Sequence, residues 1–314
     1  MNAEIFAEWL RRQGHRVVRT ESSYWYDAGT RVYQAFPYHW LIQPSEAELT
    51  EFLRRKGAIG LRYSAPVESP VGQISYHVVC ENPQYRMDLL DRRTRQNVRN
   101  GLNHCRVEQV PLSRLAEEGW QLEIDTVDRQ GRHVKVDKES WSRRYRAASD
   151  LPGFEAWGAL VGDRLVASIM MFRMDDWCEM ISQQCHRDFL PARVNNAMAF
   201  TVTQAIMRRP GILSIFYALH SLDAPSSMDE FKFRMGYAAK KVRQRVVFHP
   251  WLTPVIGSTC RSVVDGLVRM RRGHPALPKV AGMLRFYLEG KRPLGEQSWP
   301  ECLVQGGEAA GARS

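Results

Sequence analysis

Short apolar segments alternate with amphipathic ones through the second half of the chain. Two apolar runs, Trp157–Val161 and Leu165–Met171, flank the turn residues Gly162-Asp163-Arg164, and this pattern predicts a β-hairpin. A third strand is expected near Glu179–Gln183. A polar loop follows it, and then a helix from Val194 to Met207.

The pattern after this helix completes a mixed α/β unit. It predicts a buried strand at Ser214–Leu219, a short helix at Met228–Met235 and a last strand at Ala239–Phe248. Upstream of the hairpin, a strand at Cys105–Val110 and two helical stretches, Leu112–Gly131 and Glu139–Ala148, are expected. We therefore predict an α/β (α+β) fold with a mixed sheet, whose ligands bind at the open ends of the strands.

The first hundred residues show the same alternation. Ser45 followed by Glu48 is a capping-box pattern that opens a helix, and Asp27-Ala28-Gly29-Thr30 marks a hairpin turn. The elements expected in order are a helix at Met1–Gln13, a strand at His15–Thr20, the hairpin within Tyr24–Leu41, a helix to Arg55, strands at Ile59–Tyr63 and Gln73–Cys80, and a helix at Met87–Leu102.

The composition is that of a globular protein with room for two halves. The chain has 314 residues, of which 44% are hydrophobic and 25% charged. No apolar run approaches the roughly 18–20 residues that span a bilayer, and the acidic residue within Met1–Ile5 argues against a signal peptide. We expect a cytoplasmic protein, with peripheral contact at the inner face of the membrane as an option.

The cysteine pattern argues against a metal site. No Cys-x-x-Cys pair and no zinc-finger spacing of His occurs, so no metal is expected. Cys185 beside His186 is a weak candidate for a nucleophile–base pair, because neighbours in a strand point to opposite faces. The six cysteines are interpreted as reduced packing residues: Cys80, Cys105, Cys178, Cys185, Cys260 and Cys302.

Positive charge is concentrated near the end of the chain. Residues 251–293 hold eight Lys or Arg residues against two acidic ones, so they carry +6 of the net charge of +10. Helices at Val255–Met270 and Ala276–Leu288 are expected here, and disorder at Leu294–Ser314. A basic tail suits an anionic partner such as a lipid surface, tRNA or a phosphorylated donor; DNA is not among the partners expected.

The order of elements from Cys105 to about Pro250 resembles the GNAT N-acetyltransferase fold. The segment Phe231-Lys232-Phe233-Arg234-Met235-Gly236-Tyr237 is similar to the Phe-Lys-x-x-(apolar)-Gly-(aromatic) sequence of the FemAB-like branch. The resemblance implies an N-acyltransferase that moves an acyl or aminoacyl group from a thioester or ester donor to an amine. It also implies two GNAT-like halves in tandem, a degenerate half at 1–104 and a transferase domain at 105–250. The charge and helical pattern add a basic helical tail at 251–293.

The resemblance implies acyl-CoA as the donor, with an acyl carrier protein or an aminoacyl-tRNA as alternatives. In GNAT proteins a Gln/Arg-x-x-Gly-x-Gly/Ala loop and a helix N-terminus hold the pyrophosphate of coenzyme A. The matching loop here, residues 186–196, has no glycine. Arg187, Arg193, Asn195 and Asn196 are the candidate donor contacts; helix capping and solvation are the alternative roles for the last three.

Candidate catalytic residues lie where the buried strand ends. Tyr217 and His220 lie at the carboxyl end of this strand, which the resemblance makes the edge of the active site, so either is a candidate acid or base. Packing with a satisfied hydroxyl is the alternative for Tyr217. Lys232 is the leading candidate for contact with substrate or donor phosphate; the alternative is an ordinary surface lysine.

Two further segments carry candidate contacts. Asp125, Asp128 and Arg129 resemble the Thr-x-x-Arg segment beside the acceptor channel of FemAB-like proteins, with Asp128 or Asp125 as a candidate base and Arg129 as a substrate contact; an exposed ion pair is the alternative. Arg95 and Arg99 belong to a segment similar to the Arg-x-x-(apolar)-Arg/Lys pattern between the two halves. They are candidate phosphate contacts or members of a solvated basic face.

Two functions therefore compete. The first is a transferase acting on an amine of a small-molecule, polysaccharide or other cell-envelope acceptor. The second is a binding protein without catalysis, whose basic surfaces bind tRNA or an anionic membrane. A third, weaker idea is that Val255–Leu288 docks on a membrane surface instead of packing on the body of the protein.

Overall fold

A computed structural model describes residues 3–129, 137–222, 229–271, 274 and 276–304. The chain forms two compact units, each assembled from separate segments. Unit 1 comprises Met1–Gly14, Val79–Tyr217 and Asp229–Ala238, and unit 2 comprises His15–Val78, Ala218–Met228 and Ala239–Ser314. The predicted helix end at 130–131, the predicted helix start at Met228 and the predicted disorder of 305–314 lie outside the described residues.

Unit 1 is built on strands in the order β10-β9-β8-β7-β6. Successive strands from β6 to β9 pair antiparallel, whereas β10 pairs parallel with β9. A parallel pair needs a crossover connection, and α7 (Val194–Met207) supplies it. The strand bounds are β6 Arg106–Val110, β7 Phe154–Val161, β8 Arg164–Met174, β9 Trp177–Cys185 and β10 Ser214–Leu219.

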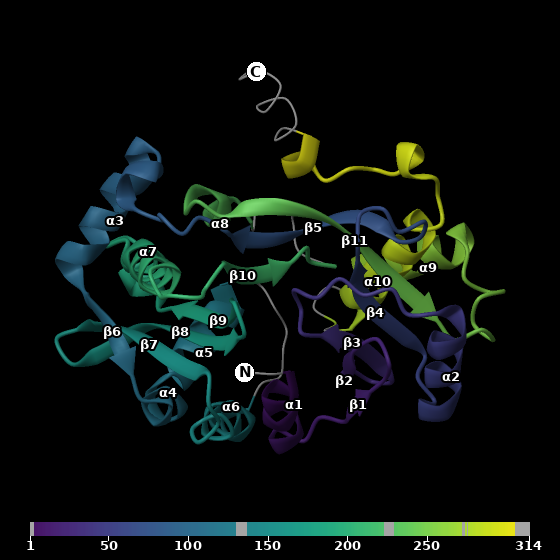
Figure 1. The fold of residues 1–314 in the computed structure, drawn as a ribbon, viewed down its shortest axis with the longest axis horizontal. Helices are drawn as coiled ribbons and strands as arrows, with labels where there is room; N and C mark the ends of the chain where they lie inside the picture. The colour runs from purple at the N-terminus through teal and green to yellow at the C-terminus, as the bar shows by residue number, and fades with distance from the viewer. Residues whose placement is uncertain (1–2, 130–136, 223–228, 272–273, 275, 305–314) are drawn as a thin grey trace. The chain divides into compact units, whose positions relative to one another are not determined.

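Helices cover both faces of the unit 1 strands (Figure 1). α7 lies on one face with α3 (Arg92–His104) packed against it, and α4 (Leu112–Glu118), α5 (Trp120–Arg129) and α6 (Lys138–Arg146) belong to the other face. The contact of α3 with α7 is close, because a Cβ on Gly101 would lie 2.3 Å from the carbonyl oxygen of Arg193.

The first helix of the chain, α1 (Ala3–Arg12), packs in unit 1. The ring of Phe6 lies 5.3 Å from that of Phe172, and the indole N–H of Trp9 donates to the carbonyl of Arg144 at 2.8 Å. The amphipathic pattern correctly predicts this helix. The partners are more than 130 residues away along the chain, so local pattern carries no information about them.

Unit 2 has the strand order β1-β2-β3-β4-β11-β5. β2 and β3 form the predicted antiparallel hairpin, and β3 pairs parallel with β4 through the crossover helix α2 (Glu46–Lys56). The predicted cap is confirmed, because Ser45 Oγ accepts the Glu48 N–H at 3.1 Å. The strand bounds are β1 Val17–Arg19, β2 Tyr24–Gly29, β3 Val32–Phe36, β4 Gly60–Ala65, β5 Gln73–Cys80 and β11 Ala238–Phe248.

Each unit thus contains an antiparallel strand pair followed by a helical crossover to a parallel strand. The sequence β2-β3-α2-β4 in unit 2 repeats the topology of β8-β9-α7-β10 in unit 1 (Figure 1). The predicted mixed α/β fold with two similar halves is therefore confirmed at the level of topology.

Two apolar clusters hold unit 2 together. One contains Trp25, Phe52 of α2 and Leu61 of β4, and the other contains Val246 of β11 with Met283, Phe286 and Tyr287 of α10 (Leu277–Glu289). α9 (Ser258–Met270) packs on α10. No helix among the described residues combines the length and the apolar content needed to cross a bilayer.

Residues 294–304, which follow α10, are structured, although the sequence predicts disorder for them. A 3₁₀ turn spans Leu294–Glu296, and the side chain of Gln297 is buried. Gln297 Oε1 accepts the N–H of Ile74 at 2.7 Å, and its Nε2 donates to the carbonyl of Arg292 at 2.8 Å. These hydrogen bonds to backbone groups fix the segment, and amino-acid composition does not predict them.

A buried histidine in unit 2 should make stability depend on pH. Burial, together with nearby cations, lowers the pKa of His77 from 6.5 to about 3; its Nε2 lies 2.8 Å from Ser64 Oγ. Since the folded pKa is the lower one, the unfolded state binds more protons below pH 6.5, and stability falls as the pH drops through this window. Relative to His77→Gln, the native chain should lose about 2 kcal/mol between pH 7.5 and 5.

Urea unfolding of both chains at the two pH values measures this difference. The matched control is Gln96→Ala, which replaces an exposed side chain of α3 that has no titratable group; this variant should keep the pH dependence of the native chain. Equal pH slopes for His77→Gln and the native chain would contradict the prediction.

Candidate functional site

β10 and β9 stay in register only at their beginnings. Ser214–Phe216 pair with Trp177–Glu179, yet β9 continues to Cys185 in register with β8. The register of β8 with β9 shifts between Met170, opposite Ser182, and Met171, opposite Met180, so Ile181 is the extra residue of a β-bulge. Beyond Glu179, therefore, the edge of β9 that faces away from β8 is no longer paired in register with β10. Backbone amides on such an edge are available to a ligand.

A chain of side-chain hydrogen bonds crosses this point. The Tyr217 hydroxyl donates to Gln183 Oε1 at 2.5 Å, and Gln183 Nε2 donates to Asn195 Oδ1 at 2.7 Å. The chain thus joins β10, β9 and the first turn of α7. Burial, which is the larger cause, and the charge of Asp229, which is the smaller, raise the pKa of Tyr217 above its ordinary value of 10. The hydroxyl is therefore protonated at neutral pH, where it acts as a donor or acid and not as a base.

Lys232 lies next to Tyr217 and is not an ordinary surface lysine. It belongs to α8 (Glu230–Arg234), and its Nζ donates to Asp229 Oδ1 at 2.5 Å. The same Nζ lies 4.8 Å from the centre of the Tyr217 ring, within cation–π range. The side chains of Lys232 and Asp229 are only 16% and 10% exposed. The ammonium group is therefore held in one place, beside the hydroxyl-bearing ring.

The contacts of the residues after α8 explain why a glycine and an aromatic residue end the Phe-Lys segment. Gly236 has φ +85° and ends the helix, and a Cβ there would lie 3.1 Å from the Tyr85 ring. On either side, the Met235 carbonyl accepts from the Tyr85 hydroxyl at 2.7 Å, and the Tyr237 hydroxyl lies 2.7 Å from Thr203 Oγ1 of α7. These contacts fix the end of α8 and thereby the position of Lys232.

The four predicted donor contacts, which lie between β9 and the first turn of α7, have different environments. The guanidinium of Arg187 is bound by the carboxylates of Asp125 and Asp128, and its backbone N–H donates to Asp125 Oδ2 at 2.8 Å. Asp128, the candidate base, therefore neutralises a candidate donor contact. An ion pair is present in this region, although its cation is Arg187 and not Arg129.

Arg193 has a different environment. It occupies the N-cap position of α7 with φ +63°, its side chain is exposed, and that side chain makes no capping hydrogen bond to the helix. Its carbonyl accepts the N–H groups of both Asn196 and Ala197. The amides of Val194 and Asn195 precede the first helical hydrogen bond, as at any helix N-terminus, and suit an anion. The side-chain amide of Asn196 donates to Met235 Sδ at 3.6 Å.

The remaining predicted residues have other partners or face solvent. In unit 2, the His220 N–H donates to the Tyr76 carbonyl at 3.1 Å, and its Nδ1 lies 3.1 Å from Ser75 Oγ. Arg95 donates to the carbonyl of Leu90 at 2.8 Å, which ties the start of α3 to the preceding turn. Arg99 and Arg129 are exposed. Burial raises the pKa of Cys185 to about 12, so its thiol remains protonated and suits packing better than nucleophilic chemistry.

Two residues that contact Lys232 or Tyr217 are absent from the candidates predicted from the sequence. Asp229 lies three residues before Lys232, a spacing at which helical side chains meet, so an ion pair was predictable. Gln183 gave a weaker signal, an amide side chain within a strand. Its link to Tyr217 depends on how β9 and β10 pair, which the local pattern does not contain.

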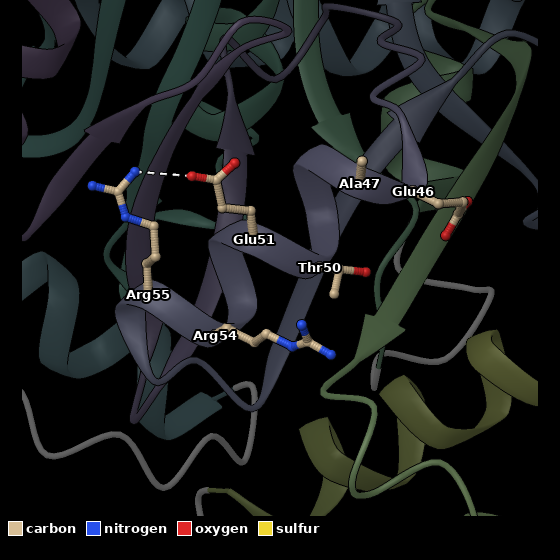
Figure 2. A pocket seen from close by; sticks show the side chains of 6 residues that line it. All are labelled: Glu46, Ala47, Thr50, Glu51, Arg54 and Arg55. Carbon is tan, nitrogen blue, oxygen red and sulfur yellow. Dashed lines mark hydrogen bonds and ion pairs between the residues drawn. The ribbon is translucent and has the colours of Figure 1, made fainter.

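A shallow hollow lies along α2 in unit 2 (Figure 2). Its lining consists of surface side chains of a single helix, and the ion pair of Arg55 with Glu51 spans one end at 2.9 Å. None of the predicted site residues belongs to it. The residues that line it are Glu46, Ala47, Thr50, Glu51, Arg54 and Arg55.

Comparisons with known proteins define the fold. No protein-family model and no curated protein sequence matches this chain. Among solved structures, the C-terminal domain of a candidate lysylphosphatidylglycerol synthetase from Agrobacterium fabrum matches with a TM-score of 0.54 at 11% identity, over 86% of this chain and 93% of that domain. FemX matches with a TM-score of 0.54 at 10% identity, over 80% and 93% of the two chains.

A conserved protein of unknown function from Bacteroides thetaiotaomicron is also similar, with a TM-score of 0.50 at 10% identity over 79% of this chain and 91% of that one. At these identities the likeness concerns the fold. The protein therefore shares the fold of FemX and of the synthetase domain, which agrees with the FemAB-like fold that the Phe-Lys segment and the order of elements predict.

Proposed function

We propose that the protein is a transferase that moves an acyl or aminoacyl group from a thioester or ester donor to an amine. The observation that carries the proposal is the loss of register between β10 and β9 beside the Ile181 bulge, with Tyr217 and Lys232 at that point. A similar solved structure bears the name of a synthetase that makes an aminoacylated lipid, which favours aminoacyl transfer as one option.

The residues around the bulge suit the charge changes of acyl transfer. The amine nitrogen attacks the carbonyl carbon, the carbonyl oxygen becomes negative, the nitrogen loses a proton, and the C–S or C–O bond breaks as the leaving atom gains a proton. Amides on the β9 edge near Ile181 would hold the carbonyl oxygen, and the ammonium of Lys232 would stabilise developing negative charge. Tyr217 would turn its hydroxyl proton from Gln183 to the leaving atom while it takes up the proton of the attacking nitrogen, so that it ends protonated.

The N-terminus of α7 is the part of the loop that suits a phosphate-bearing donor. Arg193 has an exposed guanidinium beside the uncapped start of the helix, and the helix dipole favours an anion there. Arg187 suits this role less well, because two carboxylates already bind it. We therefore assign donor contact to Arg193 and to the first amides of α7, and a structural role to Arg187.

The second candidate is a binding protein that kept the fold without the chemistry. The pairing of Arg187 with Asp125 and Asp128 favours it, because the loop then offers less positive charge to a pyrophosphate than its sequence suggests. Under this alternative the chain binds an anionic partner and transfers no group to any amine.

A thermal-shift screen against acetyl-CoA, long-chain acyl-CoA and aminoacyl-tRNA tests the donor assignment. A donor that binds the folded chain at a hundredfold excess over its Kd should raise the free energy of unfolding by about 2.7 kcal/mol. Arg193→Ala should abolish most of this shift, because it removes the cation beside the helix start. Turnover with the stabilising donor and a panel of amines then separates the two candidate functions.

The matched control is Arg208→Ala, an exposed arginine at the other end of α7. It should leave the shift intact. An equal loss of shift in both variants would mean a general effect of charge. A full shift in Arg193→Ala would remove this residue from the donor site.

A further inference from the structure

Unit 2 exposes an apolar surface near its end. Trp251 and Val255 precede α9, and Val263, Leu267 and Met270 lie on the helix itself. Trp251, Val263 and Met270 are 61%, 58% and 83% exposed. We name these five residues the α9 face. Single exposed apolar residues are common, but five within one segment mark an interaction surface.

The apolar residues of α9 form two neighbouring stripes, roughly a third of a turn apart. Val263, Leu267 and Met270 are spaced i, i+4 and i+7, which puts them on one side of a helix. Val264 and Val268 form the second stripe and are half-buried, while α9 packs on α10 (Figure 1). Each of the two stripes needs an apolar environment. α10 provides one, and the α9 face requires a second.

Three cations of this segment form no ion pair within the part of the chain that the structure describes. Arg261 pairs with Asp265 at 3.6 Å and Arg292 with Glu289 at 3.1 Å, which uses both acidic residues of 251–293. Arg269, Arg271 and Lys279 are exposed and form no ion pair with any other described residue. Arg269 and Arg271 flank Met270 in the sequence, and Lys279 lies on α10, which packs on α9. Unpaired cations therefore accompany the exposed apolar side chains of this segment.

We propose that the α9 face docks on the surface of a bilayer that contains anionic lipid, with α9 lying in the plane of the interface. The apolar side chains enter the boundary between headgroups and acyl chains, and Arg269, Arg271 and Lys279 contact lipid phosphates. A nucleic acid would satisfy the cations and leave Met270 and Trp251 in water, so the observations favour lipid. This docking is independent of the proposed transferase activity.

Sedimentation of the full chain with vesicles tests the proposal. Binding is expected to vesicles of phosphatidylcholine with 30 mol% phosphatidylglycerol, which is an experimental choice, and to be at least about tenfold weaker with phosphatidylcholine alone. The triple variant Val263→Ser, Leu267→Ser, Met270→Ser should weaken binding to the anionic vesicles by about tenfold or more, because it removes the side chains that enter the bilayer. The variant Arg269→Gln, Arg271→Gln, Lys279→Gln should do the same, and its remaining binding should depend less on salt.

Matched controls separate docking from general effects. Leu213→Ser removes an apolar side chain that is 63% exposed in unit 1, and Arg16→Gln, Arg54→Gln, Lys56→Gln removes three exposed cations elsewhere in unit 2. Both should bind vesicles like the native chain. Thermal unfolding of each variant confirms that it is folded.

Three results would overturn the proposal. One is the absence of binding to anionic vesicles at low salt, and another is an equal loss of binding in the control variants. The third is a different partner: tRNA binding that the Gln variant abolishes with no vesicle binding, or self-association that the Ser variant abolishes, would make the α9 face a nucleic-acid or subunit surface instead.

Discussion

Replacing Lys232 with alanine is expected to lower kcat/KM for acyl transfer by about a hundredfold, once a donor and an amine are in hand. The ammonium of Lys232 lies 4.8 Å from the Tyr217 ring and is held by Asp229. Alanine removes a fixed positive charge where negative charge develops in the transition state. Because the lysine is mostly buried, the variant should also lose about 1–3 kcal/mol of stability through the buried carboxylate left behind.

A control lysine that also lies over an aromatic ring is Lys241, whose Nζ lies 5.3 Å from the centre of the Trp299 ring in unit 2. Lys241→Ala removes a cation from an aromatic ring without touching the proposed site, so its kcat/KM should equal that of the native chain. Asp229→Asn should lower kcat/KM less than Lys232→Ala does, since it loosens the ammonium without removing it. Native kcat/KM in Lys232→Ala would exclude this residue from the reaction.

Gly101→Ala should destabilise the protein by about 1–3 kcal/mol, although alanine favours helix formation. The added Cβ would lie 2.3 Å from the carbonyl oxygen of Arg193 and 2.7 Å from the Cβ of Ala197. Backbone cannot yield as a flexible side chain does, so α3 must move away from the start of α7. Chemical denaturation at equilibrium measures the change in free energy of unfolding.

A second glycine within a helix provides the control. Gly266 lies in the middle of α9, and an added Cβ there meets nothing within 4 Å. Gly266→Ala should therefore be neutral or stabilise the protein by up to about 1 kcal/mol. Equal effects of the two substitutions would mean that helix propensity, and not the contact of α3 with α7, determines the result for Gly101.

Elements bounded by strong local signals were predictable. The predicted limits of α7, β10 and β5 agree with the structure residue by residue, because each combines an apolar run with polar or helix-breaking neighbours. The predicted helix from Met87 begins instead at Arg92. Asp91 accepts the Thr94 N–H at 3.0 Å and caps the helix, while Met87–Leu89 form a separate 3₁₀ turn.

The candidate site was predictable only in part. Its members Tyr217, Lys232 and Asn195 carry chemistry that can be recognised in the sequence. The ion pairs of Arg187 join residues about sixty positions apart, and the Ile181 bulge is a property of two paired strands. Such features depend on which distant segments meet, and residue patterns along one segment do not encode it.

The position of α1 constrains how the chain matures on the ribosome. Phe6 and Trp9 are translated about 150 residues before their aromatic partners Phe154 and Phe172. Until those partners emerge, the apolar side of the nascent helix lacks its native contacts, while the segment of unit 2 between His15 and Val78 has already been translated. Unit 1 therefore completes its core late in synthesis, and α1 exposes apolar side chains until then.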